Sequence, residues 1–146
     1  MRSGVQGGRS GIAGGGSGFY WVVSPVEIAN NLDRWWTGFM RALGKELEQV
    51  GVKITDWSKA NHPWQNITGA AERSLTTEVM QEGGNWVILH HADPGIDAEG
   101  ADHVFWMEVR WDGRYGVLRI SLQHHYDDVM SAVKRAMKAV TIASRF

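Results

Sequence analysis

The residues best suited to catalysis or metal binding in this sequence are its six histidines. The pair His90-His91 is followed by Asp93, and the pair His124-His125 is followed by Asp127. Neutral imidazole and carboxylate are suitable ligands for zinc, iron or manganese. Adjacent side chains, however, point to opposite faces of a strand and lie about 100° apart on a helix, so neither pair can chelate one ion. The spacing favours surface or interface histidines, and we expect no metal and no other cofactor.

Other catalytic motifs are missing or incomplete. The sequence has no G-x-S-x-G nucleophile elbow and no G-x-x-x-x-G-K-[ST] phosphate loop. Ser131 and Lys134 match S-x-x-K, but the companion motifs S-D-N and K-T-G are absent. Glu108 near Arg110 has the residue types of a general acid and its pKa modifier, but an ion pair or a subunit contact is the simpler interpretation. We therefore expect that the protein is not an enzyme.

Composition narrows the class of protein further. The 146 residues suit one domain, and 15 Lys and Arg against 16 Asp and Glu give a net charge of -1, which disfavours general neutralisation of nucleic-acid phosphates. Without cysteine there is no disulfide framework and no thiolate metal site. The longest apolar run, residues 19–23, is too short for a membrane span of about 20 residues. Eight tryptophans exceed the needs of one small core, which predicts aromatic contact with a partner.

The N-terminal residues 1–23 are predicted to form a flexible arm. Eight of the first 18 residues are glycine, and ordering such a stretch costs much backbone entropy. Its end, Phe19-Tyr20-Trp21-Val22-Val23, has high strand preference. Two interpretations stay open: a solvated tail, or an arm that adds a strand to the sheet edge of a neighbouring subunit.

A long amphipathic helix is predicted from about Pro25 to about Lys59. Ser24 is suited to cap it, Pro25 to occupy its first position and Glu27 to complete a capping box. Apolar residues then recur at steps of three and four. They include Ile28, Leu32, Phe39, Leu43, Leu47, Val50 and Ile54.

The remainder, to residue 146, is predicted to complete a single domain that begins at residue 24. Strand-like runs on either side of Gly83-Gly84 predict a β-hairpin. Residues 93–102 are expected to form an acidic loop, and residues 117–120 a strand after the turn at 112–115. Periodicity does not separate a buried strand from a short helix at residues 104–109, for which we favour a helical turn. A final helix is expected from about His124 to Ala143. We predict an α+β fold in which two long helices pack on a small antiparallel sheet.

The order of these motifs resembles the neck or tail-completion proteins of long-tailed bacteriophages. After the long helix come Pro63 and Thr68-Gly69 followed at a short spacing by Ser74-Leu75, and then the hairpin. The second half matches in an aromatic run that ends at Glu108, a DGRY-type turn, and the strand and helix that follow. The resemblance covers roughly residues 28–140. The chain departs from the family in lacking a Tyr-Gly pair before the Glu and a Pro at the strand-to-helix junction.

The resemblance implies a non-enzymatic virion protein that is made in the host cytoplasm. Such a protein forms a ring of six or twelve copies between the capsid connector, or head-closure protein, and the tail tube. The genome would pass through the lumen of this ring without sequence-specific binding. A tail terminator that caps the tail tube is the nearest alternative. A more remote alternative, from the residues alone, is a nucleic-acid-binding module that stacks bases on Trp35, Trp36, Trp57 and Trp64.

Two groups of residues are candidates for contacts in the ring. The first group combines aromatic residues with two charged ones and is predicted at the subunit interface: Phe19, Tyr20, Trp21, Trp35, Trp36, Trp106, Glu108 and Arg114. The second group is the acidic set expected at the lumen or at an axial contact: Asp93, Asp97, Glu99 and Asp102.

Overall fold

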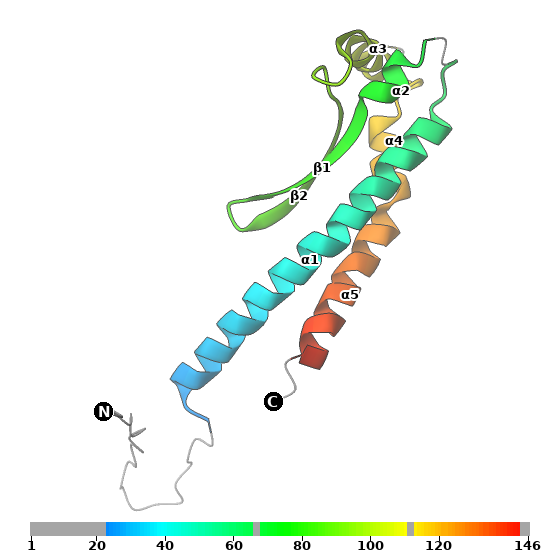
Figure 1. Cartoon of the computed structure of the whole chain (residues 1–146). Helices are drawn as coiled ribbons and strands as arrows, with labels where there is room; N and C mark the ends of the chain where they lie inside the picture. The colour runs from blue at the N-terminus through cyan, green and yellow to red at the C-terminus, as the bar shows by residue number, and fades with distance from the viewer. Residues whose placement is uncertain (1–22, 66–67, 111–112, 144–146) are drawn as a thin grey trace, which may run out of the picture. The chain divides into compact units, whose positions relative to one another are not determined.

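The computed structural model describes residues 23–65, 68–110 and 113–143 (Figure 1). Apart from Val23, the predicted arm, with Phe19, Tyr20 and Trp21, lies outside the described residues. The described residues form five helices and one two-stranded antiparallel sheet, which confirms the α+β class. The chain divides into two compact units, Met1–Arg34 and Trp35–Phe146, and the features below belong to the second unit unless stated otherwise.

Helix α1, Pro25–Asn61, begins at the predicted residue. In the first unit, the Ser24 side-chain oxygen accepts a hydrogen bond from the Glu27 amide at 3.1 Å, and the Ser24 carbonyl accepts one from the Ile28 amide at 3.0 Å. This is the geometry of an N-cap, which satisfies amides that have no partner within the helix. The helix ends two residues before Pro63, because proline has no amide hydrogen to continue the helical ladder.

The predicted hairpin is confirmed. Strand β1, Leu75–Glu82, pairs antiparallel with β2, Asn85–Ala92, and Glu82 faces Asn85 across the turn. Gly83 and Gly84 have φ of 54° and 84°. A two-residue turn with positive φ at both positions is the type I′ turn, which suits glycine because side chains disfavour this region.

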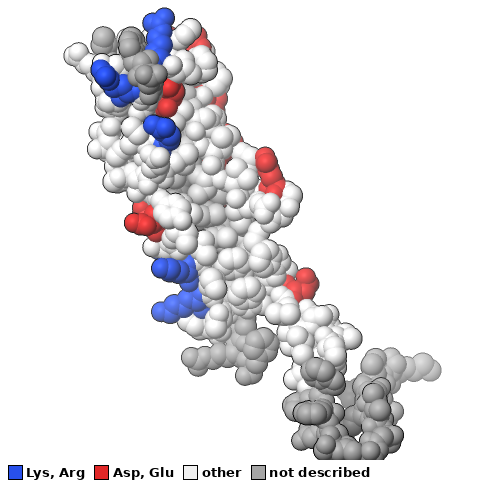
Figure 2. All heavy atoms as spheres, turned by 180° about the vertical axis from the view of Figure 1, so that it is seen from behind, with Lys and Arg blue, Asp and Glu red and all other residues white. Residues whose placement is uncertain are grey.

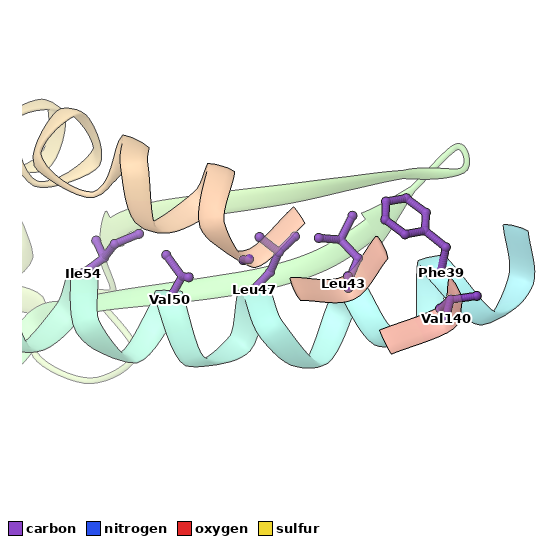
Figure 3. Packing of buried hydrophobic residues seen from close by; sticks show 8 residues of the cluster. Phe39, Leu43, Leu47, Val50, Ile54 and Val140 are labelled. Carbon is purple, nitrogen blue, oxygen red and sulfur yellow. The ribbon is translucent and has the colours of Figure 1, made fainter. Parts of the chain in front are cut away.

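The larger core lies between α1, the hairpin and α5, Tyr126–Ala143. Figure 1 shows α5 running alongside α1, and Figure 3 shows the apolar side chains of α1 pointing into the space that α5 and the hairpin share. Ala132 and Ala136 of α5 are almost fully buried members of this core. The other buried members are Phe39, Leu43, Leu47, Val50, Ile54 and Val140.

A tryptophan fastens the hairpin to α1. The indole of Trp86 lies across Gly44, so closely that a Cβ at this position would overlap the ring. Its Nε1 donates a hydrogen bond to the Met40 carbonyl at 2.9 Å. Two helical turns further along α1, Gly51 faces Val79 of β1. A Cβ added at position 51 would lie 3.2 Å from a Val79 methyl group. The glycines at 44 and 51 therefore allow side chains of the hairpin to pack directly against the backbone of α1.

A smaller core joins α2, Ala70–Ser74, and α3, Ala98–Val109. Its buried members are Ala71, Leu75, Val104 and Val117. Gly100 of α3 lies directly against the backbone carbonyl of Ala70, and a Cβ at position 100 would overlap that oxygen. The two helices thus meet backbone to backbone at one glycine.

Two predicted elements are wrong. The loop expected over residues 93–102 gives way to α3 from Ala98 onward, because the Asp97 side chain caps the helix by accepting a hydrogen bond from the Gly100 amide at 3.0 Å. The strand expected at 117–120 is instead helix α4, Leu118–His124. The buried residues Val117, Ser121 and His125 are four apart, which is a helical stripe. Two of the three are polar, so a search for apolar periodicity misses it.

Candidate assembly surfaces

Helix α3 exposes an apolar patch formed by Phe105, Trp106 and Val109, named here the α3 patch. These three side chains are 58%, 51% and 55% exposed. The two rings meet edge to face with centroids 5.7 Å apart, and the Arg110 guanidinium lies 4.9 Å from the Trp106 ring centroid. A helix with apolar residues on both its inner and outer sides is expected to be covered on both. The predicted interface residue Trp106 is therefore available to a partner.

Helix α5 exposes a second apolar surface, formed by Tyr126, Met130 and Met137 and named here the α5 stripe. All three side chains are exposed, at spacings of four and seven residues that place them on one side of the helix. Methionine side chains adapt to the shape of a partner, and tyrosine is enriched at protein interfaces. The α5 stripe has the composition of a binding surface.

The adjacent residues Trp35 and Trp36 have different environments. Trp35 is partly buried, packs against the larger core and stacks on Phe39 with centroids 5.4 Å apart and an interplanar angle of 5°. Trp36 is 52% exposed and only tilts over the same ring. Of this adjacent pair, both predicted at the interface, Trp36 has the larger exposed surface for contact with a partner. In the first unit, Val26 and Leu32 of α1 are also exposed.

Glu108, the acidic residue that ends the aromatic run, has a contact within its own chain. Its Oε1 accepts hydrogen bonds from the amides of Val117 at 2.5 Å and Leu118 at 2.7 Å, so the carboxylate caps the start of α4. Gly116 leaves the necessary room, since a Cβ there would lie 2.5 Å from Oε2. Glu108 thereby ties α3 to α4. Arg114, the other charged residue predicted at the interface, is exposed.

The acidic set divides into two kinds of residue. Asp97 caps α3 and accepts hydrogen bonds from Arg73 at 2.9 and 3.2 Å. The Gly100 amide, and then Arg73, hold the pKa of the Asp97 carboxyl below its ordinary value. Asp93 accepts a hydrogen bond from the Gly95 amide at 2.7 Å. Glu99 and Asp102 are exposed on α3. The last two are thus the members best placed for contacts outside the chain.

Within each histidine pair, the two side chains have different environments. His90, a residue of β2, is buried, and its Nδ1 lies 2.8 Å from the Thr76 carbonyl and 2.9 Å from the Thr77 hydroxyl. Its neighbour His91 lies 3.1 Å from Glu78 on the opposite face of the strand. His125 is buried and His124 is exposed. Within the described residues, no three His, Asp or Glu side chains come together as a metal site.

Burial of His90 predicts a loss of stability in acid. Desolvation lowers the pKa of His90 below its ordinary value of 6.5, so the unfolded chain binds a proton more readily. Stability is therefore full above pH 6.5 and falls as the pH drops toward the folded-state pKa. Measured by urea unfolding between pH 7.5 and 5, His90→Gln is expected to show a shallower fall than the wild type, whereas the exposed-site control His103→Gln keeps the wild-type slope. Equal slopes for all three proteins would contradict this assignment.

The four tryptophans of the stacking hypothesis do not form one surface. Trp57 stacks on His124 and Trp64 on His62, each with centroids 4.5 Å apart, and both pack against the smaller core. Trp35 is partly buried against the larger core. Charged side chains of both signs are scattered over the face shown in Figure 2, with wide uncharged areas between them. The structure offers little to favour base stacking along a basic groove.

No protein-family model matches the sequence, and neither a curated protein nor a solved structure matches it. Among the described helices, none combines the length and hydropathy of a membrane-spanning segment.

Sequence reasoning missed the close contacts at Gly44, Gly100 and Gly116. Each glycine lies where a Cβ would overlap another part of the chain. Such positions are set by tertiary packing, and glycine's only local signal is its helix penalty of about 1 kcal/mol relative to alanine. Only Gly44 lies inside a predicted helix, so this penalty was a hint for Gly44 and not for Gly100 or Gly116.

Proposed function

We propose that this chain is a structural subunit of the head-tail junction of a tailed bacteriophage, where copies form a ring between the capsid connector and the tail. The order of sequence motifs, from Thr68-Gly69 through Ser74-Leu75 to Glu108, is the basis for the phage assignment. The exposed apolar surface of the single copy is the observation that supports assembly into a ring.

Two separate surfaces argue for a ring over a two-fold dimer. The α3 patch and the α5 stripe lie on different helices and differ in composition, one rich in flat rings and one in methionine. A contact between two different surfaces repeats from copy to copy and closes into a ring when the rotation permits. A two-fold dimer would instead use one surface on both copies. The pairing of the α3 patch with the α5 stripe is thus the simplest ring contact.

Charge also suits a conduit for DNA. The net charge of -1 avoids a strongly basic lumen, which would hold phosphates and slow the passage of the genome. Glu99 and Asp102 are exposed acidic residues on α3 and are the best candidates to face the DNA path or an axial partner. A tail terminator would share these features and differ in its partner.

Electron microscopy of the purified full chain, alone and mixed with the connector and tail tube of the phage that encodes it, tests this function. We expect rings with a central opening, and binding to one end of the connector or the tube. Single copies that bind neither component would contradict the proposal. Binding to the tube alone would select the tail terminator.

A further inference from the structure

A groove runs between α1 and the hairpin, mostly along β1. It consists of two hollows of about 550 and 300 Å³ that share Glu48 as a wall residue. In the first hollow, Trp36 and Met40 of α1 face Gln81 and Trp86 of the hairpin. In the second, every hairpin residue belongs to β1 and none to β2. The second hollow therefore lies along β1, and the first extends from β1 to Trp86 of β2.

The strand edge along this groove offers backbone hydrogen-bonding groups. Glu82 and Asn85 close a two-residue turn, so they form a hydrogen-bonded pair, and such pairs alternate along an antiparallel ladder. The backbone groups of Thr77, Val79 and Gln81 consequently point away from β2. Among the described residues the sheet has only its two strands, so no third strand pairs with this edge. An extended segment is the natural ligand of such an edge.

We propose that this groove binds residues 19–23 of a neighbouring copy as a third strand, an inference that rests on the proposed ring. The segment Phe19-Tyr20-Trp21-Val22-Val23 is uncharged and consists of aromatic and β-branched residues. Its five residues span the same length as residues 77–81 of β1. Its aromatic side chains suit the walls formed by Trp36, Met40 and Trp86.

The position of the segment favours a neighbouring copy over its own groove. Only Ser24 separates the segment from the first residue of α1, a tether too short to turn back along the helix. The charges that line the groove also suit an uncharged occupant, because Arg41 and Lys45 are balanced by Glu48 and Asp56. A strongly acidic or basic peptide would leave charge unpaired there.

Disulfide trapping tests this contact cleanly, because the chain has no cysteine of its own. Phe19→Cys and Tyr20→Cys, whose side chains would point to opposite faces of an added strand, are each mixed with Gln81→Cys in the full-length chain and oxidised. One of the two is expected to give a crosslinked pair in at least tenfold excess over the same mixture with Leu89→Cys. Leu89 is an exposed residue of β2 and is the matched control.

A backbone variant gives a second, independent readout. Gln81→Pro removes an amide that the hairpin does not use, so the chain is expected to fold but to form rings at least tenfold less well. Gln81→Ala keeps the amide and is expected to assemble like the wild type. The docking would be overturned if no crosslink formed and Gln81→Pro assembled into rings as well as the wild type. The proposed ring function would then still stand. A chain that forms neither rings nor the crosslink would overturn both.

Discussion

Gly100→Ala is expected to lower the free energy of unfolding by about 3 kcal/mol, the upper range for overpacking in a well-packed interior. The added methyl group would overlap the Ala70 carbonyl, which belongs to the backbone of α2 and cannot rotate away as a side chain could. Helices α2 and α3 would have to separate and disturb Val104 and Leu75 of the smaller core. Denaturant unfolding of the purified chain measures the effect.

Gly38→Ala is the matched control for this substitution. A Cβ at position 38 would lie 3.5 Å from a methyl group of Val140, which is ordinary van der Waals contact. The gain in helix propensity should then make this variant as stable as the wild type or more stable, by up to about 1 kcal/mol. Similar losses for both variants would show that the close contact between α2 and α3 is misassigned.

Trp106→Asp is expected to weaken assembly at least about 30-fold, which corresponds to the 2 kcal/mol typical of an interface hot spot. Trp106 is 51% exposed, so the free chain loses little packing when the indole side chain is removed. In an interface, however, the new carboxylate would have to give up its hydration, and the apolar contacts of the indole would be lost. Sedimentation at several concentrations measures the assembly, and thermal unfolding confirms that the variant still folds.

His103→Asp controls for the added charge. His103 is exposed on the same helix but lies outside the α3 patch, so this variant is expected to assemble like the wild type. Equal loss of assembly in both variants would point to a general charge effect. Unchanged assembly of Trp106→Asp would remove the α3 patch from the proposed interface.

Local signals in the sequence were sufficient for the elements that depend on local chemistry. The Ser24 cap and the proline that follows predict the start of α1, and Gly83-Gly84 predicts the turn of the hairpin. Helix α4 could not be predicted in the same way. Its start depends on Glu108, ten residues away, and its buried stripe contains a serine and a histidine.

The candidate surfaces were only partly predictable for a similar reason. Composition indicates a surplus of tryptophan, but it does not say which rings are exposed. Trp35 and Trp36 are adjacent and chemically identical. The orientation of α1 about its own axis nevertheless places Trp35 against the core and Trp36 in solvent. The roles of Asp97 and Glu108 as helix caps likewise depend on the tertiary position of the amides that they bind.

Native mass spectrometry of the full-length chain over a range of concentrations tests the central claim most directly. A subunit whose two apolar surfaces meet head to tail around a closed circle should give one discrete oligomer, of six or twelve copies, with few intermediates. A monomer at every concentration, or a ladder of ever longer oligomers without a closed species, would contradict the account.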